Sequence, residues 1–228
     1  MFLSICCIGF SLLWITTRKS EKSANVTLYK ELQSMKIAEE GEKSTTVEEP
    51  VVVDQRPLSE RNTDYKGWLS IEGTNITFPV LQGQDNEYYL NRDFYKNKSV
   101  YGSIYMDYRN KPDDKVKIIY GHNTTDGQMF ALLLNFKESE YATNHQSISF
   151  GDNSYVLVSV NEINIEQDLA YWNLMLYSDE RIKNVLQTYV DNSLFKSDAI
   201  INDDNYIILS TCILGNEQNR FVLIAHQV

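Results

Sequence analysis

Short apolar runs separated by polar turns fill most of the chain from Trp68 to the C-terminus. Runs rich in β-branched and aromatic residues are typical of strands, and the 15 tyrosines and 9 phenylalanines favour the same structure. Because strands dominate and the helical segments between them are short, we predict a mainly β fold: a closed or nearly closed barrel with peripheral helices. We expect strands at residues 68–71, 76–80, 103–108, 116–120, 147–150, 154–160, 206–212 and 221–225.

Helices are expected before and between these strands. Residues 24–39 place Leu28, Leu32 and Met35 on one face of a helix. The polar residues 40–50 indicate a linker, so we assign the helix and linker to residues 18–57 and the compact domain to residues 58–228. Shorter helical segments are expected at residues 59–65, 86–91, 127–136 and 178–191.

The N-terminus carries an apolar stretch, residues 2–15, that is followed by Arg18, Lys19 and Lys22. It is shorter than the roughly 20 residues that span a bilayer. Three interpretations of residues 1–17 stay open: a short membrane anchor, which we favour, a cleaved signal peptide, or a buried helix. Basic residues after the stretch favour keeping that flank inside the cell, which conflicts with an exported domain.

The composition excludes some functions. The chain has 228 residues and a net charge of −10, and an acidic chain without a basic patch argues against nucleic acid as a partner. It contains neither a glycine-rich phosphate loop nor a metal-spaced group of cysteines and histidines. We therefore expect no metal and no cofactor.

One cysteine lies outside the N-terminal stretch, and it ends a predicted strand. Cys212 closes the run at 206–212, and Arg220 directly precedes the run at 221–225. If these strands pair, a thiol and a guanidinium face the same end of the sheet, where a nucleophile and an oxyanion donor would be needed. Each also has an ordinary explanation, as a core thiol and as a surface charge.

A histidine is the usual support of a nucleophilic cysteine. His145 lies in a polar segment and should be solvated, and His226 should lie on the face of the last strand. His122 follows the strand at 116–120, where a rigid scaffold could hold a catalytic side chain, so it is the best candidate.

Together, these residues resemble the sortase family of cysteine transpeptidases, and the form of the cysteine motif resembles class B. The resemblance covers roughly residues 58–228. It rests on Tyr120-Gly121-His122, Leu209-Ser210-Thr211-Cys212 and Arg220, and on scaffold motifs at residues 67–69, 78–83, 86–91, 101–110 and 129–130.

The resemblance implies a barrel of about eight strands with N-terminal helices and a long helix, at 178–191, between strands six and seven. It also implies a single-pass membrane enzyme on the outer face of a Gram-positive cell. Such an enzyme cuts the sorting signal of a surface protein after threonine and joins it to a peptidoglycan-precursor amine. Cys212 would attack the carbonyl, Arg220 would stabilise the oxyanion and His122 would transfer protons.

By the same resemblance, Asn86, Leu90 and Ser210 match positions that line the sorting-signal groove, although each is equally consistent with an ordinary structural role. Class B relatives favour signals of the Asn-Pro-x-Thr or Pro-x-Thr-Gly kind. Many of them carry an acidic residue directly after the cysteine, whereas this chain has Ile213, which removes a carboxylate and should change one wall of the groove.

Three questions stay open. The chain could be a cysteine peptidase that mainly hydrolyses, or an inactive membrane-tethered binding module, although the intact Cys212, His122 and Arg220 set argues against the latter. Tyr171 and Trp172 lie in a segment, 161–177, without a matching motif, and they could be groove aromatics or packing residues.

Overall fold

A computed structural model describes residues 2–42, 56–195, 197, 201–202 and 204–228. It divides the chain into two compact units, residues 1–61 and 62–228. The first unit contains α1 (Phe2–Glu42) and the short α2 (Leu58–Arg61). The helix expected at 24–39 is therefore part of a longer one, and the linker expected at 40–50 starts inside α1 and from residue 43 lies outside the described residues.

None of the helices described in this chain is both long and apolar enough to cross a membrane. The apolar stretch, residues 2–15, occupies only the first part of α1, which continues through Arg18 and Lys19. The predicted localisation as a single-pass membrane protein is therefore wrong.

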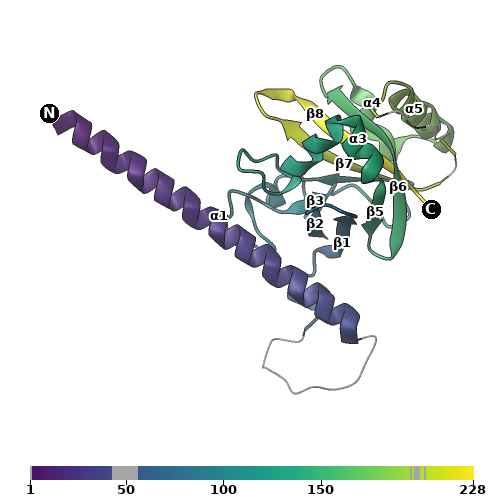
Figure 1. Ribbon diagram of the computed structural model, residues 1–228. Helices are drawn as coiled ribbons and strands as arrows, with labels where there is room; N and C mark the ends of the chain where they lie inside the picture. Colours follow the sequence, from purple (N-terminus) through teal and green to yellow (C-terminus); the bar gives the residue numbers. More distant parts are fainter. Residues whose placement is uncertain (1, 43–55, 196, 198–200, 203) are drawn as a thin grey trace. The chain divides into compact units, whose positions relative to one another are not determined.

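The second unit is a closed barrel of eight strands, so the predicted fold class is confirmed (Figure 1). Around the barrel the strands follow the order β1-β2-β3-β4-β7-β8-β6-β5. Two neighbouring pairs, β2–β3 and β4–β7, are parallel, and the others are antiparallel. The strands are β1 (Tyr65–Ile71), β2 (Thr77–Leu81), β3 (Ile104–Met106), β4 (Val116–Tyr120), β5 (Ser147–Phe150), β6 (Asn153–Asn164), β7 (Tyr206–Ile213) and β8 (Asn216–Gln227).

The sequence of β7 is a nearly continuous apolar run because both faces of this strand are buried. Residues 206–211 of β7 are all buried, on both faces of the sheet. One face of β7 lies inside the barrel. The helix η2 (Phe130–Lys137) also contacts β7 and β8. A strand that is covered on both faces does not alternate between apolar and polar residues.

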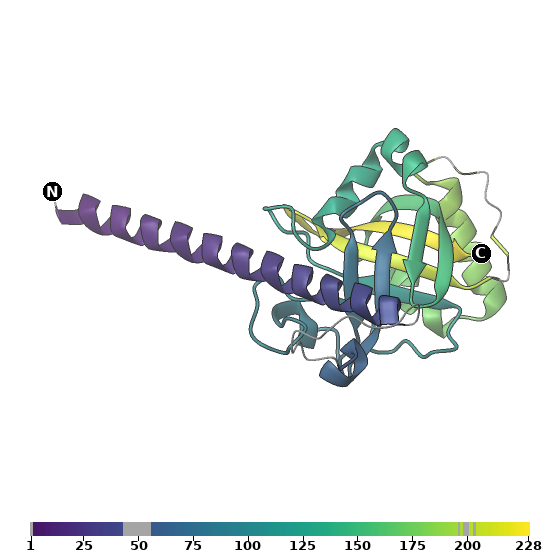
Figure 2. The same cartoon turned by 60° about the horizontal axis from the view of Figure 1, so that its bottom comes forward.

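The remaining helices decorate the barrel. Between β6 and β7 the chain forms α4 (Leu169–Asn173), η3 (Leu174–Leu176) and α5 (Asp179–Asp191), and α4 and α5 lie on the same side of the barrel in Figures 1 and 2. The apolar side of α5 buries Ile182, Leu186 and Tyr189, as its sequence pattern predicts. The other helical segments of this unit are η1 (Tyr88–Asn91) and α3 (Ser139–Asn144).

Candidate active site

Strand pairing brings the three predicted catalytic residues to one end of the barrel. β4 and β7 are parallel, with Tyr120 opposite Ser210, so the residues that follow them, His122 and Cys212, lie at the same end. β7 and β8 are antiparallel, and Cys212 lies directly opposite Arg220. Neighbours of this kind project from the same face of a sheet.

A pocket of about 270 Å³ opens at this end, and all six predicted site residues line it. Cys212 is a free thiol and is partly exposed there. The pocket therefore groups the expected nucleophile, histidine and arginine with the expected substrate contacts. Its lining consists of Asn86, Glu87, Leu90, Tyr105, Tyr120, Gly121, His122, Trp172, Ser210, Thr211, Cys212 and Arg220.

Hydrogen bonds tie the end of β7 to the loop that carries His122. The Thr211 hydroxyl donates to the Gly121 carbonyl at 2.7 Å, and the Asn123 amide donates to the Cys212 carbonyl at 2.9 Å. The Gly121 N–H in turn donates to the Ser210 carbonyl at 3.2 Å. Some of these bonds are donated by β7 and others by the loop at residues 121–123. Together they fix the histidine loop relative to the thiol.

His122 is oriented by the backbone. Its Nε2 atom lies 2.6 Å from the Leu90 carbonyl oxygen, and its own carbonyl accepts from the Phe130 N–H at 2.9 Å. A carbonyl oxygen only accepts hydrogen bonds, so Nε2 carries a proton and Nδ1 is the other nitrogen that can exchange one. The other two histidines lie outside this pocket: His145, expected to be solvated, stacks on Tyr141 instead.

The Arg220 guanidinium is held by its own hairpin. Its Nη1 atom donates to the carbonyls of Glu217, at 2.6 Å, and Asn219, at 3.1 Å. Within the described part of the chain, Nε and Nη2 have no hydrogen-bond partner. Two donors next to Cys212 are thus available to an oxyanion or a substrate carbonyl.

Aromatic residues form one wall of the pocket, and of these only Trp172 was considered a possible groove residue from the sequence. Tyr105 and Tyr120 are opposite each other on β3 and β4, with ring centroids 5.4 Å apart, and the Trp172 ring lies 6.4 Å from Tyr120. Burial raises the pKa of Tyr105, and the nearby Cys212 raises it further, so its hydroxyl stays protonated. In the predicted strands these tyrosines were indistinguishable from core residues.

The question of Tyr171 and Trp172 is resolved. Trp172 lines the pocket, whereas Tyr171 is fully buried behind it. Burial raises the pKa of Tyr171, and the nearby Ser210 hydroxyl offsets this in part, although the two hydroxyls do not reach hydrogen-bond geometry. Ser210 therefore has a buried hydroxyl without a partner among the described residues.

Ile213 is not among the residues that line this pocket, and its effect on the wall of the sorting-signal groove stays a prediction. It lies past Cys212 at the end of β7, where it is opposite Asn216 in the hairpin with β8. The bulge between Cys212 and Ile213 shifts the register at that point.

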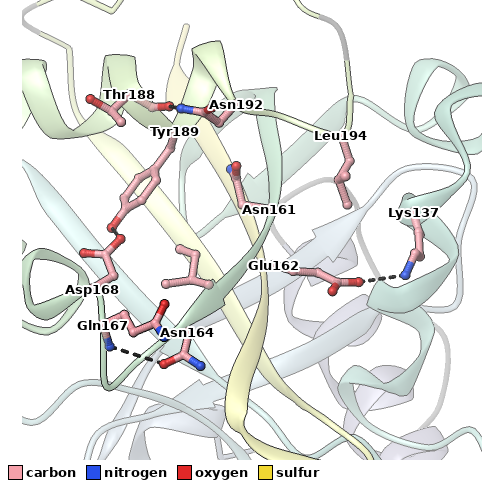
Figure 3. Close-up of a pocket in the computed structure, with 11 residues that line it drawn as sticks. Lys137, Asn161, Glu162, Asn164, Gln167, Asp168, Thr188, Tyr189, Asn192 and Leu194 are labelled. Atoms are coloured by element: carbon pink, nitrogen blue, oxygen red, sulfur yellow. Dashed lines mark hydrogen bonds and ion pairs between the residues drawn. The ribbon is translucent and has the colours of Figure 1, made fainter.

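A second pocket, of about 580 Å³, lies between β6, α5 and the loop that leads to α4 (Figure 3). Its charged groups already have partners: Lys137 pairs with Glu162 at 2.7 Å, and Asp168 accepts from Tyr189 at 2.5 Å. Among the described residues that line it, there is neither a cysteine nor a histidine. The smaller pocket at Cys212 is therefore the candidate active site.

Comparisons with known proteins agree with this geometry. The model of the sortase domain family matches residues 69–228. Sortase B of Listeria monocytogenes is 34% identical over 174 residues, which cover 74% of this chain and 71% of that protein. A structure of Clostridium perfringens sortase B is 34% identical, with a TM-score of 0.69, and the match covers 75% of this chain and 97% of that one.

A Staphylococcus aureus sortase B, solved as a substrate complex, is 25% identical with a TM-score of 0.76 and covers 91% of this chain and 98% of that one. The family match covers most of the barrel, and it includes the histidine loop and the strands that carry the cysteine and the arginine. The chain therefore belongs to the sortase family, and it is a sortase B-type cysteine transpeptidase.

Proposed function

We propose that this enzyme cleaves the sorting signal of a surface protein after threonine and transfers the new acyl group to an amine of a peptidoglycan precursor. The observation that supports this most is the single pocket that unites Cys212, His122 and Arg220 with Asn86, Leu90 and Ser210. We assign the catalytic domain to residues 58–228.

In the first step, the Cys212 thiol gives its proton to Nδ1 of His122, and the Sγ thiolate attacks the threonine carbonyl carbon. The developing oxyanion receives hydrogen bonds from the free Nε and Nη2 groups of Arg220. The C–N bond then breaks, His122 gives a proton to the leaving amine, and a thioester on Cys212 remains.

In the second step, the incoming amine attacks the thioester and loses a proton to His122, and the cysteine sulfur leaves. Water is the competing nucleophile, so the aromatic wall of Tyr105, Tyr120 and Trp172 supports transfer by limiting its access. The Asn86 amide, on a residue that lines the pocket, is suited to bind the polar backbone of the signal peptide, and Leu90 and Ser210 form part of the same lining.

The test incubates the full chain with peptides of the Asn-Pro-x-Thr and Pro-x-Thr-Gly kinds, with and without an amine acceptor, and identifies the products by mass spectrometry. We expect cleavage after threonine, a ligated product when the amine is present, and neither in Cys212→Ala. Cleavage that never yields ligated peptide would assign the chain to the hydrolases. Binding without cleavage would assign it to the inactive binding modules.

A further inference from the structure

A buried carboxylate lies behind the pocket. The Asp107 side chain, directly after β3, has no exposed surface. It accepts hydrogen bonds from three groups of Arg109: the backbone N–H and Nε, both at 2.9 Å, and Nη2 at 2.8 Å. A buried charge is costly unless it is paired and hydrogen-bonded, and Arg109 supplies both.

Asp107 also holds two residues that line the pocket. Its Oδ2 atom accepts from the Asn86 Nδ2 and from the Tyr120 hydroxyl, both at 3.0 Å. Burial alone would raise the pKa of Asp107, but the hydrogen bonds from Arg109 and Asn86 outweigh it and keep this pKa below its ordinary value. The carboxylate is therefore ionised and acts only as an acceptor.

These contacts fix which way the Asn86 carboxamide points. Its Nδ2 faces a carboxylate that can only accept, and its Oδ1 accepts from the Tyr108 N–H at 3.0 Å. Exchanging the oxygen and the nitrogen would break both bonds, so the amide has one orientation. One N–H of Nδ2 is left over, on a residue that lines the pocket.

We propose that Asp107 is a positioning residue for substrate: it fixes Asn86 so that the remaining Nδ2–H is presented to a carbonyl oxygen of the bound signal peptide. This inference rests on the proposed function, since it states how the pocket at Cys212 recognises one hydrogen-bond acceptor of its peptide substrate. Arg109 supports the arrangement from outside the pocket by neutralising Asp107.

The chain offers a closely matched control. In the loop between β3 and β4, Asp114 Oδ2 accepts from the Asn110 Nδ2 at 3.1 Å, which is also a bond between an aspartate and an asparagine amide. Neither Asp114 nor Asn110 lines the pocket. Asp114→Asn therefore tests the effect of losing such a bond without disturbing Asn86.

The experiment is a double-mutant cycle in the full chain. Asp107→Asn and Asn86→Ala should each raise KM for the signal peptide about tenfold, the loss expected for one hydrogen bond, with a smaller effect on kcat. If Asp107 acts through Asn86, adding Asp107→Asn to Asn86→Ala should raise KM no further. Asp114→Asn should leave KM unchanged in both backgrounds.

Additive effects of Asp107→Asn and Asn86→Ala on KM would overturn the proposal, as would an unchanged KM in a folded Asp107→Asn variant. If that variant does not fold, Arg109→Gln replaces it, since Arg109 donates to Asp107 and does not line the pocket. Its effect on KM should likewise disappear when Asn86 is Ala, and persistence of the effect there would contradict the proposal.

A binding measurement separates this proposal from the proposed function. The same cycle is repeated on Cys212→Ala, with the affinity for a labelled signal peptide read by fluorescence anisotropy. Coupling between Asp107 and Asn86 in affinity supports the positioning role even if turnover is absent. Tight binding without coupling would reject the positioning role and leave the proposed reaction intact.

Discussion

The Nε2 atom of His122 lies 2.6 Å from the carbonyl oxygen of Leu90. This contact comes from the η1 turn, far from Cys212 in the sequence, and it sets the tautomer of the imidazole. A backbone carbonyl thus orients the histidine.

The Leu90 carbonyl oxygen lies close to Gly102, and this predicts the effect of Gly102→Ala. Gly102 has φ +58°, and a Cβ atom there would lie 2.6 Å from the carbonyl oxygens of Leu90 and Tyr89. The carbonyl must move away, which disturbs His122. We expect kcat/KM in the peptide assay to fall at least tenfold.

Gly151→Ala is the matched control, because Gly151 has φ +59° and open space around the position of a Cβ atom. Both variants carry the same backbone strain, of about 1 kcal/mol. Gly151→Ala should lower the unfolding free energy by that amount and leave kcat/KM unchanged. Equal losses of activity in the two variants would show that the Leu90 carbonyl is not involved.

The bond from Thr211 to the Gly121 carbonyl predicts the effect of Thr211→Val. Valine keeps the shape but removes the donor and leaves a carbonyl unpaired, which costs about 1–3 kcal/mol of stability. Because this bond joins the cysteine strand to the histidine loop, we expect kcat to fall more than KM rises. Thr143→Val, which removes an exposed hydroxyl bond to Ser139, should change neither. Steady-state kinetics and urea unfolding distinguish the two variants.

Trp172 forms part of the pocket wall, so Trp172→Ala should weaken binding of the signal peptide. We expect KM to rise at least fivefold and the share of hydrolysed product to increase, because water gains access to the thioester. Leu176→Ala, at a nearby side chain that is 67% exposed, should leave both quantities unchanged. An unchanged product ratio in Trp172→Ala would mean that this side chain does not exclude water.

Acid stability should depend on Asp64. Burial would raise its pKa, but hydrogen bonds from Lys96, at 2.9 Å, and Tyr89, at 2.7 Å, lower it below the ordinary value of about 3.9. The ionised carboxylate therefore stabilises the folded state fully at pH values above the ordinary pKa. This stabilisation is lost as the pH falls through the lowered pKa of the folded state.

Urea unfolding at pH 7 and pH 3 tests this. Asp64→Asn should reduce the unfolding free energy at pH 7, and the difference from the unsubstituted protein should shrink at pH 3. The exposed Asp152→Asn substitution should have no effect at either pH. A difference for Asp64→Asn that is the same at both pH values would rule out the role of its ionised form.

The sequence predicted strands well where apolar runs end in polar turns. The bounds of β4 (Val116–Tyr120) and β5 (Ser147–Phe150) match the expected ranges. β8 is longer than the expected 221–225, because its first residues, 216–220, are polar and pair with residues at the end of β6 and β7 near the hairpin tip. Their strand structure depends on pairing and not on burial, so no hydrophobic pattern marks it.

The parts of the site that depend on local structure could be predicted, and the parts that depend on pairing between distant segments could not. The proximity of Cys212 and Arg220 could be inferred, because their strands are close in sequence and form a hairpin. The position of His122 depends on the parallel pairing of β4 and β7, which residue periodicity does not reveal. Tyr105 and Trp172 were missed or left open, since an aromatic residue at a pocket wall has the same sequence signature as one in the core.

The central claim is a thioester on Cys212, and intact-mass analysis tests it most directly. The full chain is mixed with a signal peptide in the absence of an amine and quenched in acid. Its intact mass is then measured by mass spectrometry, and the modified residue is mapped by peptide sequencing. We predict a mass gain equal to the peptide fragment that ends in threonine, located on Cys212 and lost on addition of the amine acceptor. Cleavage at full rate in Cys212→Ala, or an adduct on another residue, would contradict the account.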